Sequence, residues 1–302
     1  MNFFNSYEVI IIGGSYSGLS AAMALGRSLR SVLIIDGGNP CNWQTPHSHN
    51  FITQDGQKPQ VIAQVAKKEV LNYKKVHFLE DFALIGKKTA NGFEICTESG
   101  KTFTARKLLF ATGVKDIMPP IKGFSECWGI SAIHCPYCHG YEFRGEKTAI
   151  MANGEHAFHL AGLVNNLTND LCILTQGKSD FNKEQRCKLK THNIEIIETS
   201  IQKFQHTKGK LERVLLKDGT SLDLTAVYAS LPFEQHSSIP AKLGCVLTDT
   251  GHIKVDNFQK TEVSGIYACG DSTSPMRSVS YAVASGTIAG AMLNHELTQE
   301  DF

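Results

Sequence analysis

The sequence predicts an α/β fold with two doubly wound units, in each of which helices cover a mainly parallel sheet. Three observations support this prediction. The chain has 302 residues, which is more than one hydrophobic core usually serves. A strand, a glycine turn, a helix and a second strand follow one another within residues 9–36. A weaker copy of this pattern begins at Lys147, so we expect a second unit of the same class.

Residues 9–36 contain the clearest β-α-β unit. The apolar run over residues 9–12 has the length and the β-branched residues of a buried parallel strand. A helix of small residues is expected over about 17–28, and a second strand over 31–35 ends on Asp36. This order is the opening unit of a doubly wound sheet.

The pattern changes to short strands between about residues 78 and 110, with turns at Asn91-Gly92 and Ser99-Gly100. These turn pairs predict a β-meander. Because Pro119-Pro120 cannot continue a regular element, we expect the chain to cross into another domain there.

The second unit is expected to begin with a strand over residues 147–152. A helix over about 156–167 and a strand over 171–177 follow, and the stretch from about 194 to 230 is rich in short strands. The chain ends in a helix of small residues over about 280–297. Thus the second half repeats the first in a weaker form.

Composition excludes several functional classes. The net charge of +1 gives no reason to expect nucleic acid or an acidic membrane as a partner. No apolar run approaches the roughly 20 residues of a membrane-spanning helix. The N-terminus lacks a basic segment and a cleavage site, so we expect no signal peptide and a cytoplasmic protein. The nine cysteines are then expected to be mostly reduced.

The turn after the first strand predicts dinucleotide binding. It reads G-x-S-x-x-G and consists of Gly13, Gly14, Ser15, Tyr16, Ser17 and Gly18. The N-terminus of the following helix offers unpaired N–H groups and a positive dipole end to a pyrophosphate. Asp36, at the end of the second strand, has the position of the acid that accepts a ribose hydroxyl. We therefore expect a Rossmann-like dinucleotide site here.

Residues 134–142, "HCPYCHGYE", contain the pair Cys135 and Cys138. The pair could attach haem, bind zinc, serve structure or carry redox chemistry. No export signal supports haem, and no second cysteine pair supports zinc, so we expect no metal. C-x-x-C spacing lowers one thiol pKa, and Pro136 suits the first position of a helix. We therefore favour a redox dithiol, with His139 as an unperturbed, near-neutral proton carrier.

Four segments together identify the chain as resembling the low-molecular-weight thioredoxin reductases. They read "GGSYSGLSAA", "FATGVKD", "HCPYCHGYE" and "GIYACGDSTSPMRSVSYAVASG", in the family's order and along nearly the whole chain. The resemblance implies a homodimer with an FAD-binding domain over residues 1–114 and 240–302. It also implies an inserted NAD(P)-binding-like domain over 115–239 that carries the dithiol.

The resemblance also implies site residues. Cys138 faces the flavin and forms the adduct with it, and Cys135 attacks the partner disulfide. His47 and His49, in the loop after Asp36, form an H-x-H pair that we interpret as structural, although it could approach the flavin. The residues expected at FAD, besides the glycine turn and Asp36, are Gly37, Asn42, Asn50, Ala111, Thr112, Gly113, Gly270, Asp271, Arg277, Ser278 and Val279.

The sequence departs from the family in three places. His139 replaces the aspartate that commonly follows the second cysteine, and "CHGYE" is more similar to the gliotoxin-type dithiol oxidases. The second glycine motif, over residues 152–157, keeps only one glycine and the final alanine, and it carries Glu155. The basic cluster for the NADP phosphate is reduced to Lys178 within 175–178. We therefore expect FAD and regard NADPH or NADH as doubtful.

The sequence predicts an FAD-dependent disulfide oxidoreductase in which electrons pass between FAD and the Cys135–Cys138 pair. A reductase would take electrons from a nicotinamide, or from another carrier, and pass them to a thioredoxin-like protein. An oxidase would take them from a small-molecule dithiol and pass them to oxygen or another acceptor. A flavin-bound redox sensor is a third alternative, and the sequence leaves all three open.

Overall fold

The computed structural model describes residues 5–302, which form two compact units. The first contains residues 5–43, 51–115 and 233–302, and the second contains 44–50 and 116–232. The sequence placed the crossovers after residues 114 and 239. The first observed border lies one residue later, and the second lies before residue 233 rather than after 239. Each unit is described by itself.

The first unit has a seven-stranded sheet in the order β3-β2-β1-β6-β5-β4, with β17 paired to β6. Five strands are parallel, and β4 and β5 continue from β6 as an antiparallel meander. The strands are β1 (Ser6–Ile12), β2 (Val32–Asp36), β3 (Val76–Glu80), β4 (Ala83–Thr89), β5 (Gly92–Thr97), β6 (Thr102–Phe110) and β17 (Ile266–Ala268). The predicted β-α-β unit and meander are both present.

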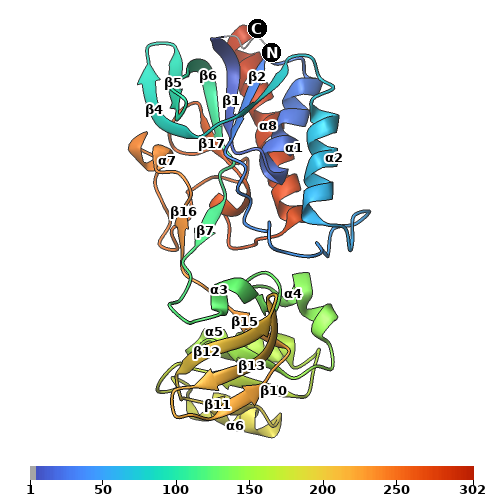
Figure 1. Cartoon of the computed structure of the whole chain (residues 1–302). Coiled ribbons are helices and arrows are strands. Elements are labelled where there is room, and N and C mark those ends of the chain that lie inside the picture. Colours follow the sequence, from blue (N-terminus) through green and yellow to red (C-terminus); the bar gives the residue numbers. More distant parts are fainter. Residues whose placement is uncertain (1–4) are drawn as a thin grey trace. The chain divides into compact units, whose positions relative to one another are not determined.

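Helices cover one face of this sheet, and the meander and a loop-rich segment lie toward the other (Figure 1). The helices are α1 (Tyr16–Arg27), α2 (Pro59–Val70) and α8 (Val279–Asp301). Side chains of β1 alternate between two buried clusters: Val9 and Ile11 pack with α1 and α8, and Ile10 and Ile12 pack with the meander. This alternation is the two-residue period of a strand buried on both faces.

The second unit has a parallel sheet in the order β11-β10-β9-β15-β8 and an antiparallel sheet β12-β13-β14. Its strands are β8 (Ala132–Ile133), β9 (Thr148–Met151), β10 (Leu171–Leu174), β11 (Glu195–Ile197), β12 (Ile201–Thr207), β13 (Lys210–Leu216), β14 (Ser221–Asp223) and β15 (Ala226–Ala229). Its helices are α3 (Phe124–Cys127), α4 (Pro136–His139), α5 (Gly154–Val164) and α6 (Lys183–Thr191), and η1 (Gly140–Phe143) is a 3-10 turn.

Short elements lie where the chain crosses between the units. Strand β7 (Val114–Asp116) pairs with β16 (Phe233–Gln235), and α7 (Ile239–Lys242) follows. The 3-10 turn η2 (Gly270–Ser272) comes after β17.

Several elements differ from the sequence prediction. No element was predicted over α2 or α6, although Pro59 starts α2 and Asn182 forms a capping box with Gln185 at the start of α6. Helix α5 begins two residues earlier than predicted, at Gly154, because Asn153 caps it, and it ends at Val164. The observed helix boundaries therefore follow the capping residues rather than the hydrophobic periodicity from which they were predicted.

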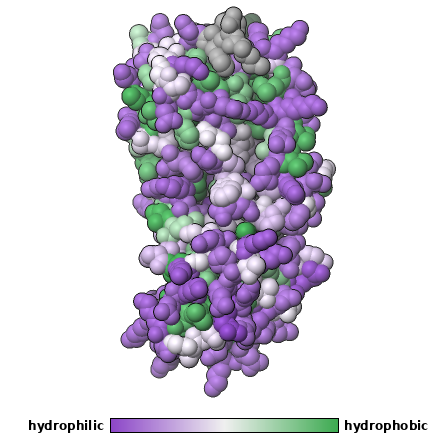
Figure 2. Space-filling model, in the orientation of Figure 1, coloured by the Kyte–Doolittle hydropathy of each residue, from purple (hydrophilic) through white to green (hydrophobic). Residues whose placement is uncertain are grey.

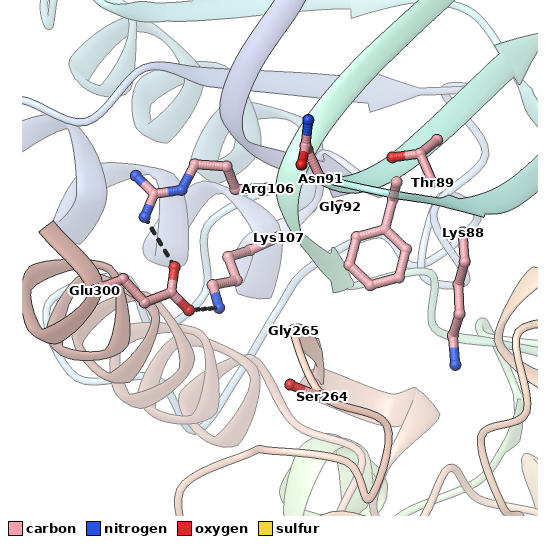
Figure 3. Close-up of a pocket in the computed structure, with 10 residues that line it drawn as sticks. Lys88, Thr89, Asn91, Gly92, Arg106, Lys107, Ser264, Gly265 and Glu300 are labelled. Carbon is pink, nitrogen blue, oxygen red and sulfur yellow. Dashed lines mark hydrogen bonds and ion pairs between the residues drawn. The ribbon is translucent and has the colours of Figure 1, made fainter.

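The surface of the first unit contains a polar hollow of about 390 Å³ beside the middle of β6 and the turn between β4 and β5. Figure 3 shows that Arg106 and Lys107 point toward Glu300 of α8 there. Arg106 Nη2 lies 2.8 Å from Glu300 Oε2, and Lys107 also pairs with Glu300. Carboxylates of α8 therefore hold Arg106 and Lys107, and Lys88 also lines the hollow.

The described part of the chain contains no helix long and apolar enough to cross a membrane. Figure 2 shows hydrophilic residues over most of one face, with small, separate hydrophobic patches. Scattered apolar side chains of this kind are common on globular proteins.

Candidate functional site

The parallel strands of the first unit all end at one edge of the sheet. Strands β1, β2, β6 and β17 end at Ile12, Asp36, Phe110 and Ala268. Ligands of open α/β sheets bind outside this carboxyl edge. The predicted residues that follow these strand ends are therefore brought together: Gly13 to Gly18, Asp36, Gly37, Ala111, Thr112, Gly113, Gly270 and Asp271.

The glycine turn allows a close approach of helix, strand and neighbouring loop. Gly13 has φ +106°, and a Cβ atom there would overlap the carbonyl oxygen of Ala111. A Cβ atom on Gly18 would overlap the carbonyl oxygen of Gly13. The N–H of Gly14 donates to Asp36 Oδ1 at 2.9 Å. The turn therefore fixes the carboxylate of Asp36 beside the start of α1.

The N-terminus of α1 is arranged to meet an anion. Its N-cap residue, Ser15, makes no side-chain cap hydrogen bond, and the first turn of α1 contains no acidic residue. Helix α8 runs beside α1 because Gly286 and Gly290 bring the two backbones together. Both helices therefore begin at the carboxyl edge of the sheet, where their dipoles favour negative charge.

The other expected FAD residues differ in their surroundings. Asn42 Nδ2 donates to Tyr16 Oη at 3.3 Å, so Asn42 lies at the start of α1. Arg277 Nε lies 3.7 Å from Asp271 Oδ2, but the Arg277 N–H donates to the Pro275 carbonyl at 2.9 Å. That N–H therefore already has a hydrogen-bond partner within the chain. Ser278 is the N-cap residue of α8, and Val279 is its first residue.

Asn50 is the one predicted FAD residue that groups with the second unit. It belongs to segment 44–50, which packs within the second unit. Its φ of 58° lies in the left-handed region, which asparagine tolerates better than most residues. The structure therefore gives Asn50 a place in a turn of that segment.

The dithiol lies in the second unit at the start of the short helix α4. Cys135 is its N-cap residue, and Pro136 takes the first helical position, as predicted. Both thiols are half-buried. The Cys138 thiol hydrogen-bonds the Cys135 sulfur and, against the opposing effect of burial, lowers the pKa of Cys135 to about 6, with the N–H groups of Cys138 and Tyr137 assisting. Cys135 is therefore the more nucleophilic sulfur near neutral pH.

The prediction that His139 has an unperturbed pKa is wrong. Its side chain is half-buried, and its ring centroid lies 6.4 Å from that of His49, with the rings perpendicular. Burial, and then the positive charge of His49, lower the pKa of His139 to about 4. His139 is thus neutral at pH 7, a form that can accept a proton.

Gly140 and Tyr228 complete the surroundings of the dithiol. Tyr228 is 1% exposed on β15, and a Cβ atom on Gly140 would lie 3.2 Å from its hydroxyl oxygen. Burial, followed by the charges of Glu142 and Cys135, raises the pKa of Tyr228 to about 12. The sequence did not indicate Tyr228, because a buried tyrosine on a central strand is usually a packing residue.

The described residues contain no group of three or more His, Cys, Asp or Glu side chains that could hold a metal ion. His47 and His49 have ring centroids 6.4 Å apart. His49 lies beside His139. The cluster of histidines is therefore a feature of the dithiol environment.

Comparison with known proteins agrees with this arrangement of a nucleotide site and a dithiol. A family model for the pyridine nucleotide-disulphide oxidoreductases matches residues 7–286. The chain belongs to this family.

Relatives of known name include thioredoxin reductases. Thioredoxin reductase tcpT of Claviceps purpurea is 31% identical over 98% of this chain and 96% of its own length. Thioredoxin reductase sirT of Leptosphaeria maculans is 30% identical over 98% and 95%. The crystal structure of TrxB from Bacillus anthracis, described as a thioredoxin reductase, has a TM-score of 0.93 and 31% identity, and covers 98% of this chain and 100% of that one.

The protein is therefore an FAD-dependent oxidoreductase of the thioredoxin reductase type, with two Rossmann-like units. The carboxyl edge of the first sheet fits FAD. Thr112 Oγ1 is buried there and has no hydrogen-bond partner among the described residues. A Cβ atom on the neighbouring Gly113 would meet nothing within 4 Å, so there is room for a ligand beside the orphaned hydroxyl.

The second glycine motif of this pyridine nucleotide-disulphide oxidoreductase is occupied by its own side chains. Asn153 Oδ1 accepts from the N–H groups of Gly154 at 2.8 Å and Asp180 at 2.9 Å. Asn153 Nδ2 donates to the Lys178 carbonyl at 2.9 Å. This one amide therefore joins the start of α5 to the loop after β10, where a pyrophosphate would otherwise be expected.

The charged residues around this motif also have partners within the protein. Glu155, in the first turn of α5, accepts from Gln185 Nε2 at 2.6 Å. Burial lowers the pKa of His156, as does the charge of His159, so His156 does not offset the charge of Glu155 at neutral pH. Arg186 is directed into the 179–181 loop, where its Nη2 donates to Ser179 Oγ at 2.7 Å.

Segment 175–178, where the family has its basic cluster, makes internal hydrogen bonds as well. Gln176 has φ 59°, and its Oε1 accepts from the Ile201 N–H at 3.1 Å. Thr175 Oγ1 donates to the Gly177 carbonyl at 2.6 Å. Lys178 lies close enough to Glu198 to help lower the pKa of that carboxyl, after the larger effect of hydrogen bonds from Ser179. The single lysine of this segment therefore faces a negative charge.

Proposed function

We propose that this protein is a dithiol oxidase, with electrons passing from a dithiol substrate through the Cys135–Cys138 pair to FAD and then to oxygen or another acceptor. The observation that carries the proposal is the Asn153 amide, which occupies the N-terminus of α5 and joins it to the 178–180 loop. A nicotinamide dinucleotide would have to break these bonds and approach Glu155. The first unit is then the FAD-binding domain, and the second is a nicotinamide-type domain that carries the dithiol.

Loss of the basic cluster supports the same conclusion. Charge-assisted hydrogen bonds are worth about 1.5–3 kcal/mol each. Loss of two such contacts would therefore weaken NADPH binding by roughly a hundred- to ten-thousand-fold. Lys178 cannot replace them, because an ammonium group lacks the planar fork that grips a phosphate.

The reaction can be written so that atoms and electrons balance. A substrate thiolate attacks Cys135 of the enzyme disulfide, forms a mixed disulfide and displaces Cys138. The second substrate thiol attacks the first substrate sulfur, closes the substrate disulfide and displaces Cys135, whose low pKa makes it a good leaving group. The two thiol protons leave through His139 and water. When bound, FAD accepts the two electrons of the dithiol, which becomes a disulfide again.

Reoxidation completes the cycle. Oxygen takes the two electrons and two protons and leaves as hydrogen peroxide, so one peroxide is formed for each substrate disulfide. Cys138 is the sulfur that passes electrons toward FAD, and Cys135 is the one that meets the substrate. His139 is neutral at pH 7, so its ring can accept a proton from a thiol.

Oxygen consumption with dithiothreitol as the probe dithiol tests this proposal. We expect uptake of oxygen, formation of one peroxide per dithiol oxidised, and loss of both in Cys138→Ser. NADPH or NADH should not replace the dithiol. No uptake with dithiothreitol would overturn the oxidase proposal, and unchanged uptake in Cys138→Ser would overturn the assignment of the dithiol. A flavin-bound sensor would bind a partner without this turnover.

A thioredoxin reductase is the second candidate, because the β9-α5-β10 unit is retained and named relatives are thioredoxin reductases. In that case a nicotinamide or another electron carrier reduces FAD, and Cys135 attacks a thioredoxin-like disulfide. Reduction of thioredoxin with NADPH would favour this candidate. The family resemblance also supports a homodimer, and the cysteine content supports a cytoplasmic location; sedimentation and cell fractionation test these two.

A further inference from the structure

His49 and Glu142 lie beside the proton carrier of the dithiol. His49 Nε2 is 3.5 Å from Glu142 Oε1, and their side chains are 20% and 37% exposed. The His49 ring stands perpendicular to that of His139, with 6.4 Å between the ring centroids. An imidazole is thus held between a carboxylate and a second imidazole, and both of its neighbours follow the dithiol directly in the sequence.

The two partners reach this position from distant parts of the chain. Glu142 is in the 3-10 turn η1, which follows α4 without a break. His49 is in segment 44–50, which leaves the first unit and packs within the second. Gly129 lies close to this segment, since a Cβ atom there would be 3.2 Å from Thr45 Oγ1. The segment therefore brings a titratable side chain to a dithiol that already has its own histidine.

We propose that His49 is a positioning residue of the dithiol: paired with Glu142, it holds the His139 ring and, when protonated, disfavours protonation of His139. This inference rests on the proposed role of His139. The charge of a protonated His49 is balanced by Glu142 on one side. On the other side it opposes a second positive charge on His139.

The other titratable groups around His139 do not replace this effect. Cys135, the N-cap residue of α4, Cys138 of α4 and Glu142 of η1 bring no positive charge, so they do not oppose a protonated imidazole. Tyr228 of β15 keeps its proton at neutral pH because burial and the charges of Glu142 and Cys135 raise its pKa. His47 is exposed, and its ring centroid lies 6.4 Å from that of His49. His49 is thus the neighbour whose charge favours a neutral His139.

Titration of His139 by nuclear magnetic resonance tests the inference without turnover. The protein, with its FAD, is labelled with carbon-13 at the Cε1 atoms of its 12 histidines. The signal lost in His139→Asn identifies His139. In the wild type we expect a midpoint of about 4. In His49→Gln we expect the midpoint to rise by on the order of one pH unit, as for a charge about 6 Å away near a protein surface.

Two variants separate the effect of charge from that of shape. His49→Arg keeps a positive charge beside Glu142, so we expect the low midpoint to be retained. His47→Gln removes a neighbouring, exposed imidazole and should leave the midpoint unchanged. A midpoint that stays low in His49→Gln would overturn the inference. So would equal increases in His49→Gln and His49→Arg, because charge would then have no role.

The proposed function can fail separately from this inference. If the wild type consumes no oxygen with dithiothreitol but the midpoint moves as expected, the oxidase proposal is wrong and the positioning role of His49 stands. If the wild type is active and the midpoint does not move, the oxidase proposal stands and the role of His49 is wrong. As a second readout, the acid limb of kcat/KM should move upward in His49→Gln and remain in place in His49→Arg.

Discussion

Three donors converge on the sulfur of Cys135: the Cys138 thiol and the N–H groups of Cys138 and Tyr137. Together they overcome burial, which favours the neutral thiol, and lower the pKa of Cys135 to about 6. At pH 7 the thiolate form of Cys135 then predominates. This charge makes Cys135 both a nucleophile and a good leaving group, as the proposed exchange with a substrate dithiol requires.

Replacing Cys138 should therefore change the pKa of Cys135. Cys138→Ala removes the thiol donor, so we expect the midpoint of Cys135 alkylation to rise from about 6 toward the ordinary value of about 8.5. Cys138→Ser keeps a hydroxyl donor and should give a smaller rise. The rate of iodoacetamide labelling against pH measures the midpoint.

Mass spectrometry of the peptide that contains Cys135 is needed for this measurement, because the exposed Cys41 and Cys187 also react. Equal midpoints in the wild type and both variants would show that the Cys138 thiol has no role in stabilising the thiolate.

The sequence predicted the identity of these residues better than their properties. C-x-x-C spacing and Pro136 were enough to predict a redox dithiol at a helix start, and the helix is observed. The pKa of His139 was predicted wrongly because it depends on burial and on His49. No local sequence pattern predicts that His49, in a loop, contacts His139, which lies far along the chain.

At the scale of elements, glycines decide how closely α1 and α8 can pack. A Cβ atom on Gly286 would overlap the backbone of Ser17 in the first turn of α1. Both helices would then have to separate at the edge of the sheet that fits FAD. Gly162 of α5 is a natural control, because a Cβ atom there would meet nothing within 4 Å.

Gly286→Ala should lower the free energy of unfolding by about 1–3 kcal/mol and release FAD more readily, because packed backbone cannot move aside. Gly162→Ala should raise the free energy of unfolding by about 0.5–1 kcal/mol, since alanine restricts the unfolded chain and favours helix. Urea unfolding and flavin fluorescence measure the two effects. Equal stability of the two variants would contradict the close approach of α1 and α8.

Strong local patterns allowed most elements to be predicted. The β1-α1-β2 unit combines a β-branched run, a glycine turn and a helix of small residues, which agree with one another. Helix α2 was missed although Ile62, Ala66 and Val70 recur every four residues, a sufficient signal on its own. Helix α6 is too polar for periodicity to indicate it, and its capping box is the local signal.

At the scale of the whole molecule, the C-terminal helix is tied to the first sheet by an ionic cluster. Lys107 Nζ and Lys260 Nζ lie 2.6 and 2.8 Å from the two oxygens of Glu296, and Tyr267 Oη donates to the same carboxylate at 2.7 Å. Burial opposes the charge of Glu296, but these hydrogen bonds outweigh it and lower its pKa to about 2.

The stability of the protein should depend on pH through this cluster. Because the folded pKa of Glu296 is lowered, its contribution is complete above the unfolded pKa of about 4.3. It is lost as the pH falls toward about 2. Glu296→Gln should cost about 2 kcal/mol of unfolding free energy at pH 7 and less at pH 3.

Urea unfolding at the two pH values measures the effect of Glu296. Glu184, whose surface pair with Lys188 leaves it 77% exposed, is the control: Glu184→Gln should cost less than about 0.5 kcal/mol at both. A cost for Glu296→Gln that does not change with pH would contradict the account of the cluster.

The division into two units followed from chain length and the repeated β-α-β pattern, but the path of segment 44–50 did not. This segment follows the first β-α-β unit in sequence, yet it packs within the second unit. This path of the segment depends on contacts between distant residues, and a single sequence read by itself gives no signal for such contacts. The weak nicotinamide motif was visible in the sequence; its occupation by Asn153 was not.

Anaerobic reduction of the bound flavin tests the central claim most directly. The purified protein is mixed with NADPH, with NADH and with dithiothreitol in separate experiments, and the visible absorption of the flavin is followed. The account predicts bleaching by dithiothreitol alone, return of the colour on admission of air, and no bleaching by dithiothreitol in Cys138→Ser. Rapid bleaching by either nicotinamide would contradict it and identify the protein as a reductase.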